Sequence, residues 1–109
     1  QFIKNPSEQV QLAAVNQNGM VIQFIKNPSE QVQIAAVKQD GYAIQYIKNP
    51  FEKVQLIAVI KNPRSLQFIK NPSKRIQFVA AKKDINTFIY CKDESVIQYC
   101  IEQYALNKV

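Results

Sequence analysis

The stretch Ile25-Lys26-Asn27-Pro28 decides the architecture of this chain, because the same four residues recur along its 109 positions. Copies begin at residues 3, 25, 47 and 69, a constant step of 22 residues. A further copy, at 60–63, lies out of step inside the third unit. A fixed period between about 20 and 50 residues is typical of solenoid arrays.

The period divides the chain into units 1–22, 23–44, 45–66 and 67–88, followed by a divergent tail at 89–109. The first two units agree at 17 of 22 positions. We predict an all-α fold: an α-solenoid of about four two-helix repeats closed by a C-terminal capping helix over 94–107. Because Gln1 falls inside a repeat, we expect the N-terminus to be truncated.

Each unit carries its own helix signals. Asn27 is a strong N-cap residue, Pro28 suits the first helical position, and Glu30 favours the first turn, which predicts a long helix of about 11 residues from the proline. Glycine should end the long helix in the left-handed conformation at Gly19 and Gly41. Shorter helices should follow at 20–25 and 42–47. In the last two units the caps of these short helices are predicted to be Asn62 and Asp84.

Three rows of equivalent residues predict how the units meet. Small residues indicate close helix approach at Ala14, Ala36, Ala58 and Ala80. Aromatic residues should form a ladder of ring contacts, with a base-stacking platform as the alternative, at Phe2, Phe24, Tyr46, Phe68 and Tyr90. Glutamines are expected to line a solvent face at Gln1, Gln23, Gln45 and Gln67, and at Gln11, Gln33, Gln55 and Gln77.

Composition argues against several classes of function. The chain has no histidine, two glycines and two cysteines, so it lacks a phosphate-binding glycine loop and the usual partner of a nucleophilic cysteine. We expect no enzyme, no metal site and no cofactor. Cys91 and Cys100 are interpreted as reduced core thiols of a cytoplasmic protein, with a disulfide between them as the alternative. No apolar run is long enough to span a membrane.

The formal charge of +6 is concentrated in the third and fourth units, which carry +3 and +4, whereas the first two units are neutral. Several of these basic residues are not required by the repeat, since earlier units have other residues there. The candidate partner-binding residues are Lys53, Arg64, Lys74, Arg75, Lys82 and Lys83. The lysines of the repeated motif, which should line one edge of the array, supply the secondary candidates Lys48 and Lys70.

The segment 37–47, Val-Lys-Gln-Asp-Gly-Tyr-Ala-Ile-Gln-Tyr-Ile, resembles a family of tandem helical repeats of unknown function found in bacterial, bacteriophage and giant-virus proteins. The resemblance extends over residues 1–88. It implies a small repeat protein that acts by binding another protein. Inhibitors of bacterial defence systems such as CRISPR are one group of proteins with this mode of action.

We therefore expect a protein-binding repeat module, an inhibitor or adaptor that docks on a host protein with an acidic surface. Non-specific nucleic-acid binding through the basic patch of residues 48–83 is the first alternative. A structural segment of a longer repeat array is the second.

Overall fold

The computed structural model describes residues 6–107, and all the regular elements within that range are helices. Long α-helices alternate with 3-10 helices of six residues. The α-helices are α1 (Glu8–Gln17), α2 (Glu30–Gln39), α3 (Glu52–Lys61), α4 (Lys74–Lys83) and α5 (Glu94–Asn107). The 3-10 helices are η1 (Gly19–Phe24), η2 (Gly41–Tyr46), η3 (Pro63–Phe68) and η4 (Ile85–Tyr90).

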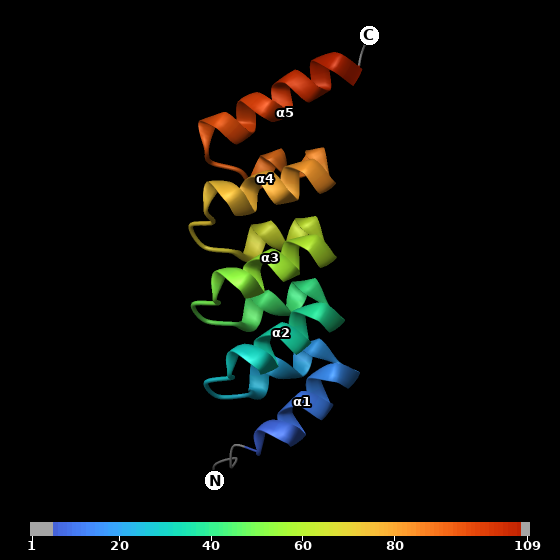
Figure 1. Ribbon diagram of the computed structural model, residues 1–109, viewed down its shortest axis with the longest axis vertical. Helices are drawn as coiled ribbons and strands as arrows, with labels where there is room; N and C mark the ends of the chain where they lie inside the picture. Colours follow the sequence, from blue (N-terminus) through green and yellow to red (C-terminus); the bar gives the residue numbers. More distant parts are fainter. Residues whose placement is uncertain (1–5, 108–109) are drawn as a thin grey trace.

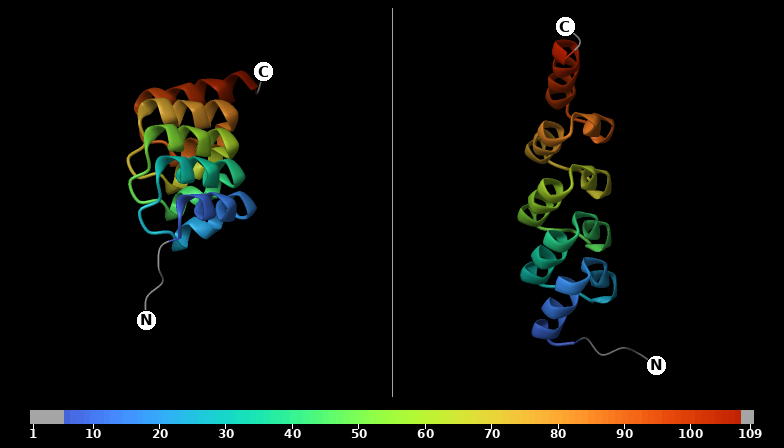
Figure 2. Two further views of the ribbon diagram at one scale, coloured as in Figure 1. Left: turned by 60° about the horizontal axis from the view of Figure 1, so that its bottom comes forward. Right: turned by 90° about the vertical axis from the view of Figure 1, so that its right-hand side faces the viewer.

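The helices stack into an elongated rod of 59 × 22 × 21 Å (Figure 1). Two layers are visible from the side, with the long helices in one and the 3-10 helices in the other (Figure 2). Each unit packs on the next along the rod, and α5 closes the C-terminal end. The predicted α-solenoid with a capping helix at 94–107 is confirmed. The motif residues 1–5 lie outside the described range.

The core is built from the same repeat positions in successive units. Val32, Val54 and Ile76 occupy one repeat position, and Val96, like them, is the third residue of its helix; all four are fully buried. Val10 holds this position in α1, the first helix of the described stack, and is 56% exposed. The small residues Ala36, Ala58 and Ala80 are also fully buried, which agrees with the predicted close approach between units.

The predicted helix start was wrong by two residues. Helix α2 begins at Glu30, and its cap is Ser29, whose Oγ accepts a hydrogen bond from the Val32 N–H at 3.2 Å. Asn27 instead adopts a left-handed backbone with φ 52°. Asparagine tolerates this region better than most residues, so it turns the chain between units and leaves the capping to the serine.

The predicted role of the glycines was also wrong. No glycine has a positive φ in the described residues, so neither ends its helix in the left-handed conformation. A Cβ placed on Gly41 would lie 2.7 Å from the Ala58 carbonyl oxygen, and one on Gly19 would lie 2.5 Å from that of Ala36. Glycine is needed at both positions because the backbone of the next unit leaves no room for a side chain.

The short helices were predicted correctly in place, although they begin one residue earlier and are 3-10 rather than α. The predicted caps are confirmed: Asn62 Oδ1 accepts from the Arg64 N–H at 3.1 Å, and Asp84 Oδ1 from the Asn86 N–H at 3.0 Å. The equivalent residues Asn18 and Asp40 do the same in the first two units.

The predicted aromatic ladder is not formed by the described members of the row. Phe24 is 78% exposed, and Phe68 packs edge-on against Tyr42, which is not a member, with ring centroids 5.6 Å apart. The ring contacts found in the described residues do not join two members of the row. Their use as a base-stacking platform stays a prediction.

The second glutamine row does not line a solvent face as predicted. Gln11, Gln33 and Gln77 are buried, and Gln55 is half-buried. In each, Nε2 donates to the carbonyl oxygen of the proline five residues earlier, at 2.7–3.1 Å. The described members of the first row, Gln23, Gln45 and Gln67, are exposed as predicted. The buried amides thus fasten each inter-unit loop to its long helix.

Both cysteines are free, buried thiols, as interpreted from the sequence. Burial, reinforced by the neighbouring Cys100 and Asp93, raises the pKa of Cys91 to about 11. Burial also raises the pKa of Cys100. Both side chains therefore remain protonated at neutral pH, the form with little nucleophilicity.

The Cys91 thiol predicts a loss of stability in alkali. An unfolded thiol ionises near its ordinary pKa of 9.0, whereas the folded one ionises near about 11. The raised pKa means that the folded state favours the protonated thiol. This contribution to the free energy of unfolding is fully present below pH 9 and should be lost as pH rises toward 11. Urea denaturation across this range measures the effect. Cys91→Ile, which restores the residue of the other units, should show a smaller fall; an equal fall would contradict the assignment.

Candidate interaction surface

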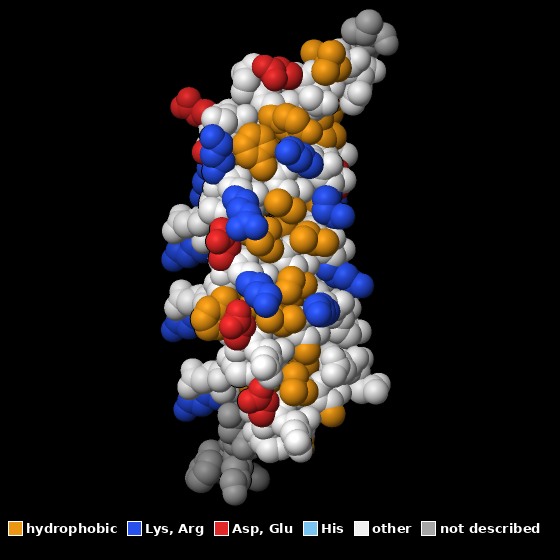
Figure 3. Space-filling model, viewed as in Figure 1, with side chains coloured by type: hydrophobic (Ala, Val, Ile, Leu, Met, Phe, Trp, Pro, Cys, Tyr) orange, Lys and Arg blue, Asp and Glu red, His pale blue; other side chains and the backbone are white. Residues whose placement is uncertain are grey.

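A stripe of hydrophobic side chains runs along the outer surface of the long-helix layer, with Lys and Arg on both sides of it (Figure 3). We call this surface the long-helix face. Its apolar residues are partly buried, and those of α2, α3 and α4 form pairs of consecutive residues. They include Leu12, Ile34, Ala35, Leu56, Ile57, Phe78, Val79, Ile97 and Tyr99.

The structure brings five of the six sequence-predicted binding residues onto two adjacent helices. Lys53 lies at the start of α3, Lys74 and Arg75 lie at the start of α4, and Lys82 and Lys83 end α4. All five are exposed. Because α3 packs directly against α4, their positive charges reinforce one another across neighbouring units.

The ring of Phe78 lies between two of these lysines. Lys74 Nζ is 5.9 Å and Lys82 Nζ is 5.7 Å from its centroid, within the range of a cation–π interaction. On its other side Phe78 packs edge-on against Tyr99 of α5, with centroids 5.7 Å apart. The lysine stems and the ring thus form one surface that is apolar at its centre and positive at its margins.

Arg64, the sixth candidate, lies apart from the other five. It belongs to η3 in the layer of 3-10 helices, and its Nε is 3.7 Å from Asp84 Oδ2. The ion pair is partly exposed and joins two successive units, so it neutralises much of the charge that Arg64 would offer to a partner. The ion pair was not predicted from the sequence, because Asp84 lies 20 residues after Arg64 and belongs to the next unit.

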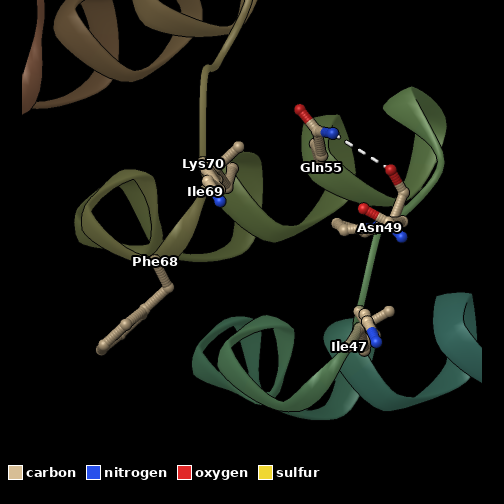
Figure 4. Close-up of a pocket in the computed structure, with 8 residues that line it drawn as sticks. Ile47, Asn49, Gln55, Phe68, Ile69 and Lys70 are labelled. Carbon is tan, nitrogen blue, oxygen red and sulfur yellow. Dashed lines mark hydrogen bonds between the residues drawn. The ribbon is translucent and has the colours of Figure 1, made fainter.

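The secondary candidates Lys48 and Lys70 are brought together at the edge formed by the inter-unit loops. They line one groove of about 460 Å³ with Ile47, Gln55, Phe68 and Ile69 (Figure 4). The expectation that the motif lysines mark one edge of the array therefore holds for these two residues.

Sequence reasoning missed the apolar half of the long-helix face. The signal was present in the outward-facing pairs, which are Leu12-Ala13 and Ile34-Ala35 in the neutral units but Leu56-Ile57 and Phe78-Val79 in the basic ones. Larger apolar residues therefore occur in the same units as the added positive charge. That coincidence makes α3 and α4 the centre of the candidate surface.

The described residues contain no cluster of three or more side chains suited to bind a metal ion, and none of their helices has the length and hydrophobicity needed to cross a bilayer. Comparison of the chain with family models, with curated proteins and with solved structures found no match. The resemblance to tandem helical repeats of bacteria and viruses stays a prediction.

Proposed function

We propose that the chain is a non-enzymatic protein-binding module that docks its long-helix face on an acidic surface of a partner protein. The observation that carries this proposal is the joint presence of positive charge and partly exposed apolar side chains on α3 and α4. Large apolar side chains give affinity when water is excluded from them, and surrounding charges select and orient the partner. A nucleic-acid backbone would need the charges but not the apolar stripe.

The resemblance to repeats of bacterial and viral proteins supports a host protein as that partner. An inhibitor or adaptor that covers a functional surface of a bacterial protein, such as a component of a defence system, needs no catalytic group. A rigid repeat array is suited to this role because its binding surface is extended and preformed.

A variant that restores the neutral-unit residues tests the proposal without endangering the fold. Lys53→Gln, Lys74→Glu and Arg75→Gln give units three and four the residues that units one and two have at these positions. The protein retained from a bacterial lysate by the wild type should be lost by this triple variant. Lys38→Glu, at the repeat position of Lys82 but in a neutral unit, is the matched control and should retain it.

The competing outcome is nucleic-acid binding. A gel shift with duplex DNA at about 50 and about 200 mM salt measures it, since backbone contacts weaken steeply with salt. Wild-type shifts that disappear in the triple variant, with no protein retained from the lysate, would overturn the proposal.

The single change Lys74→Glu should separate binding from stability. Lys74 is the first residue of α4, where a carboxylate favours the positive end of the helix dipole. We expect the free energy of unfolding to rise by about 0.3–1 kcal/mol while partner binding falls. Urea denaturation and the pull-down measure the two effects; a loss of both together would indicate that Lys74 supports the fold instead.

A further inference from the structure

Three grooves of similar build follow one another along the edge formed by the inter-unit loops. They measure about 380, 460 and 270 Å³ and lie between successive copies of the repeated motif. Each contains a motif isoleucine, a motif lysine or its equivalent, a proline and a ring of the aromatic row. We call them the loop-edge grooves. They lie at the ends of the long helices, away from the long-helix face.

The grooves are positively charged and have one aromatic wall. Lys48 lines both the first and the second groove, Lys70 lines the second and Lys92 the third. The aromatic walls are Tyr46, Phe68 and Tyr90 in the same order. None of the residues lining the three grooves is acidic. The ligand charge that fits them is therefore negative.

The buried glutamine row supplies hydrogen-bond acceptors to the first two grooves. Gln33 and Gln55 each donate Nε2 to a proline carbonyl at 3.1 Å, which fixes the direction of the amide. Figure 4 shows the Gln55 Oε1 turned away from that carbonyl. Gln33 Oε1 is buried in the wall of the first groove and has no hydrogen-bond partner in the described residues. A buried acceptor without a donor is unfavourable, so Gln33 Oε1 would accept from an incoming N–H group once the amide moves enough to open it to the groove.

The C-terminal cap shows what this glutamine oxygen binds when a donor is present. Gln77 Oε1 accepts hydrogen bonds from the consecutive N–H groups of Lys92 and Asp93, at 2.8 and 2.9 Å. In the inner units, the loop that would supply these donors contains Asn49 or Asn71 with φ 54°. The left-handed residue turns the peptide differently, and no such bond to Gln33 Oε1 forms.

We infer that the loop-edge grooves bind a peptide segment of a partner protein in the polyproline II conformation, with an acidic side chain at every third residue. Its carboxylates pair with Lys48 and Lys70, and its main-chain N–H groups donate to the oxygens of Gln33 and Gln55. Packed helices lie about 8–10 Å apart, and a polyproline II chain rises about 3.1 Å per residue with about three residues per turn. Every third side chain of such a peptide therefore points the same way and meets an equivalent groove. This inference uses a different surface from the proposed function and does not depend on it.

The unpaired Gln33 oxygen favours a peptide over a nucleic-acid backbone. Lysines attract phosphate as well as carboxylate, but phosphodiester groups offer no hydrogen-bond donors to a glutamine oxygen. A peptide main chain offers one at almost every residue. A single-stranded oligonucleotide is accordingly the competing probe in the test.

The test is fluorescence anisotropy of the full chain with a labelled polyproline II peptide of about 12 residues that has aspartate at every third position. Three changed probes follow: the same composition with its aspartates clustered, the same sequence with N-methylated amides, and a thymidine oligonucleotide. We expect the spaced peptide to bind at least roughly tenfold more tightly than each of the others. Equal binding of spaced and clustered peptides, or preference for the oligonucleotide, would overturn the inference.

Variants of the protein locate the binding. Lys48→Gln with Lys70→Gln should weaken peptide binding by roughly tenfold or more and leave the thermal melt unchanged, because both residues are exposed. Lys74→Gln, on the long-helix face, should bind the peptide as the wild type does. If Lys74→Gln weakens peptide binding and the double variant of Lys48 and Lys70 does not, the peptide binds the long-helix face and the inference is wrong. The triple variant of Lys53, Lys74 and Arg75 tests the proposed function separately. Whether it loses the protein retained from the lysate does not depend on the result of the peptide assay.

Discussion

Replacing Val54 with aspartate is expected to lower the free energy of unfolding by about 4 kcal/mol or more, enough to unfold most of the protein. Val54 is fully buried between units, with a solvent-exposed fraction of 0%. A carboxylate there would lose its hydration, and α3 offers no basic side chain on the side that faces the core. Urea denaturation followed by circular dichroism measures the loss.

Val10→Asp provides the matched control. Both valines are the third residue of a ten-residue helix, so helix propensity and the favourable placement of a carboxylate near the N-terminus are the same in the two variants. Val10 is 56% exposed, and we expect a change of about 0.5 kcal/mol or less. Similar losses in the two variants would contradict the stacking of units as the source of burial.

Replacing Ala58 with leucine should destabilise the protein by about 1–3 kcal/mol. Ala58 is fully buried, and its carbonyl oxygen lies so close to Gly41 that a Cβ there would be only 2.7 Å away. Three additional carbon atoms in such an interface must displace the backbone of η2 or force a strained rotamer. Thermal and urea denaturation of the variant measure the cost.

Ala13→Leu is the control for this substitution. Ala13 is exposed on the outer side of α1, and the third unit has Ile57 at the same repeat position. A larger side chain is therefore compatible with the fold, and stability should change by about 0.5 kcal/mol or less. An unchanged melt for Ala58→Leu would show that the units are packed more loosely than the structure indicates.

Much of the fold followed from the sequence because the chain repeats itself. A residue pattern with a constant step makes the units equivalent, and the apolar positions of each unit demand neighbours that cover them. The capping helix at 94–107 was predicted with its observed bounds, since Asp93 and Glu94 mark its start and its apolar residues follow a helical period. The caps Asn62 and Asp84 were predicted for the same local reason.

The candidate surface was only half predictable. The excess of basic residues in units three and four is visible in the composition, and it led to Lys53, Lys74, Arg75, Lys82 and Lys83. The sequence did not reveal that Arg64 pairs with Asp84, because that contact depends on how neighbouring units pack. By contrast, Phe78 lies between Lys74 and Lys82 because these residues are four apart on one helix, and this could have been predicted.

By itself, the sequence determined the repeat, its helical class, its C-terminal cap and the units in which positive charge collects. These properties depend on local propensity and on a period that is independent of the path of the chain. Tertiary structure alone decided that Asn27 turns the chain while Ser29 caps, that the glycines make room for the next unit, and that Gln33 and Gln55 fasten the inter-unit loops to their helices. Each of these outcomes depends on the rotation and spacing between neighbouring units. For the Ile-Lys-Asn-Pro motif, the 22-residue period shows which residues of the units are equivalent. It does not show which side chains and backbone groups of the neighbouring units they contact.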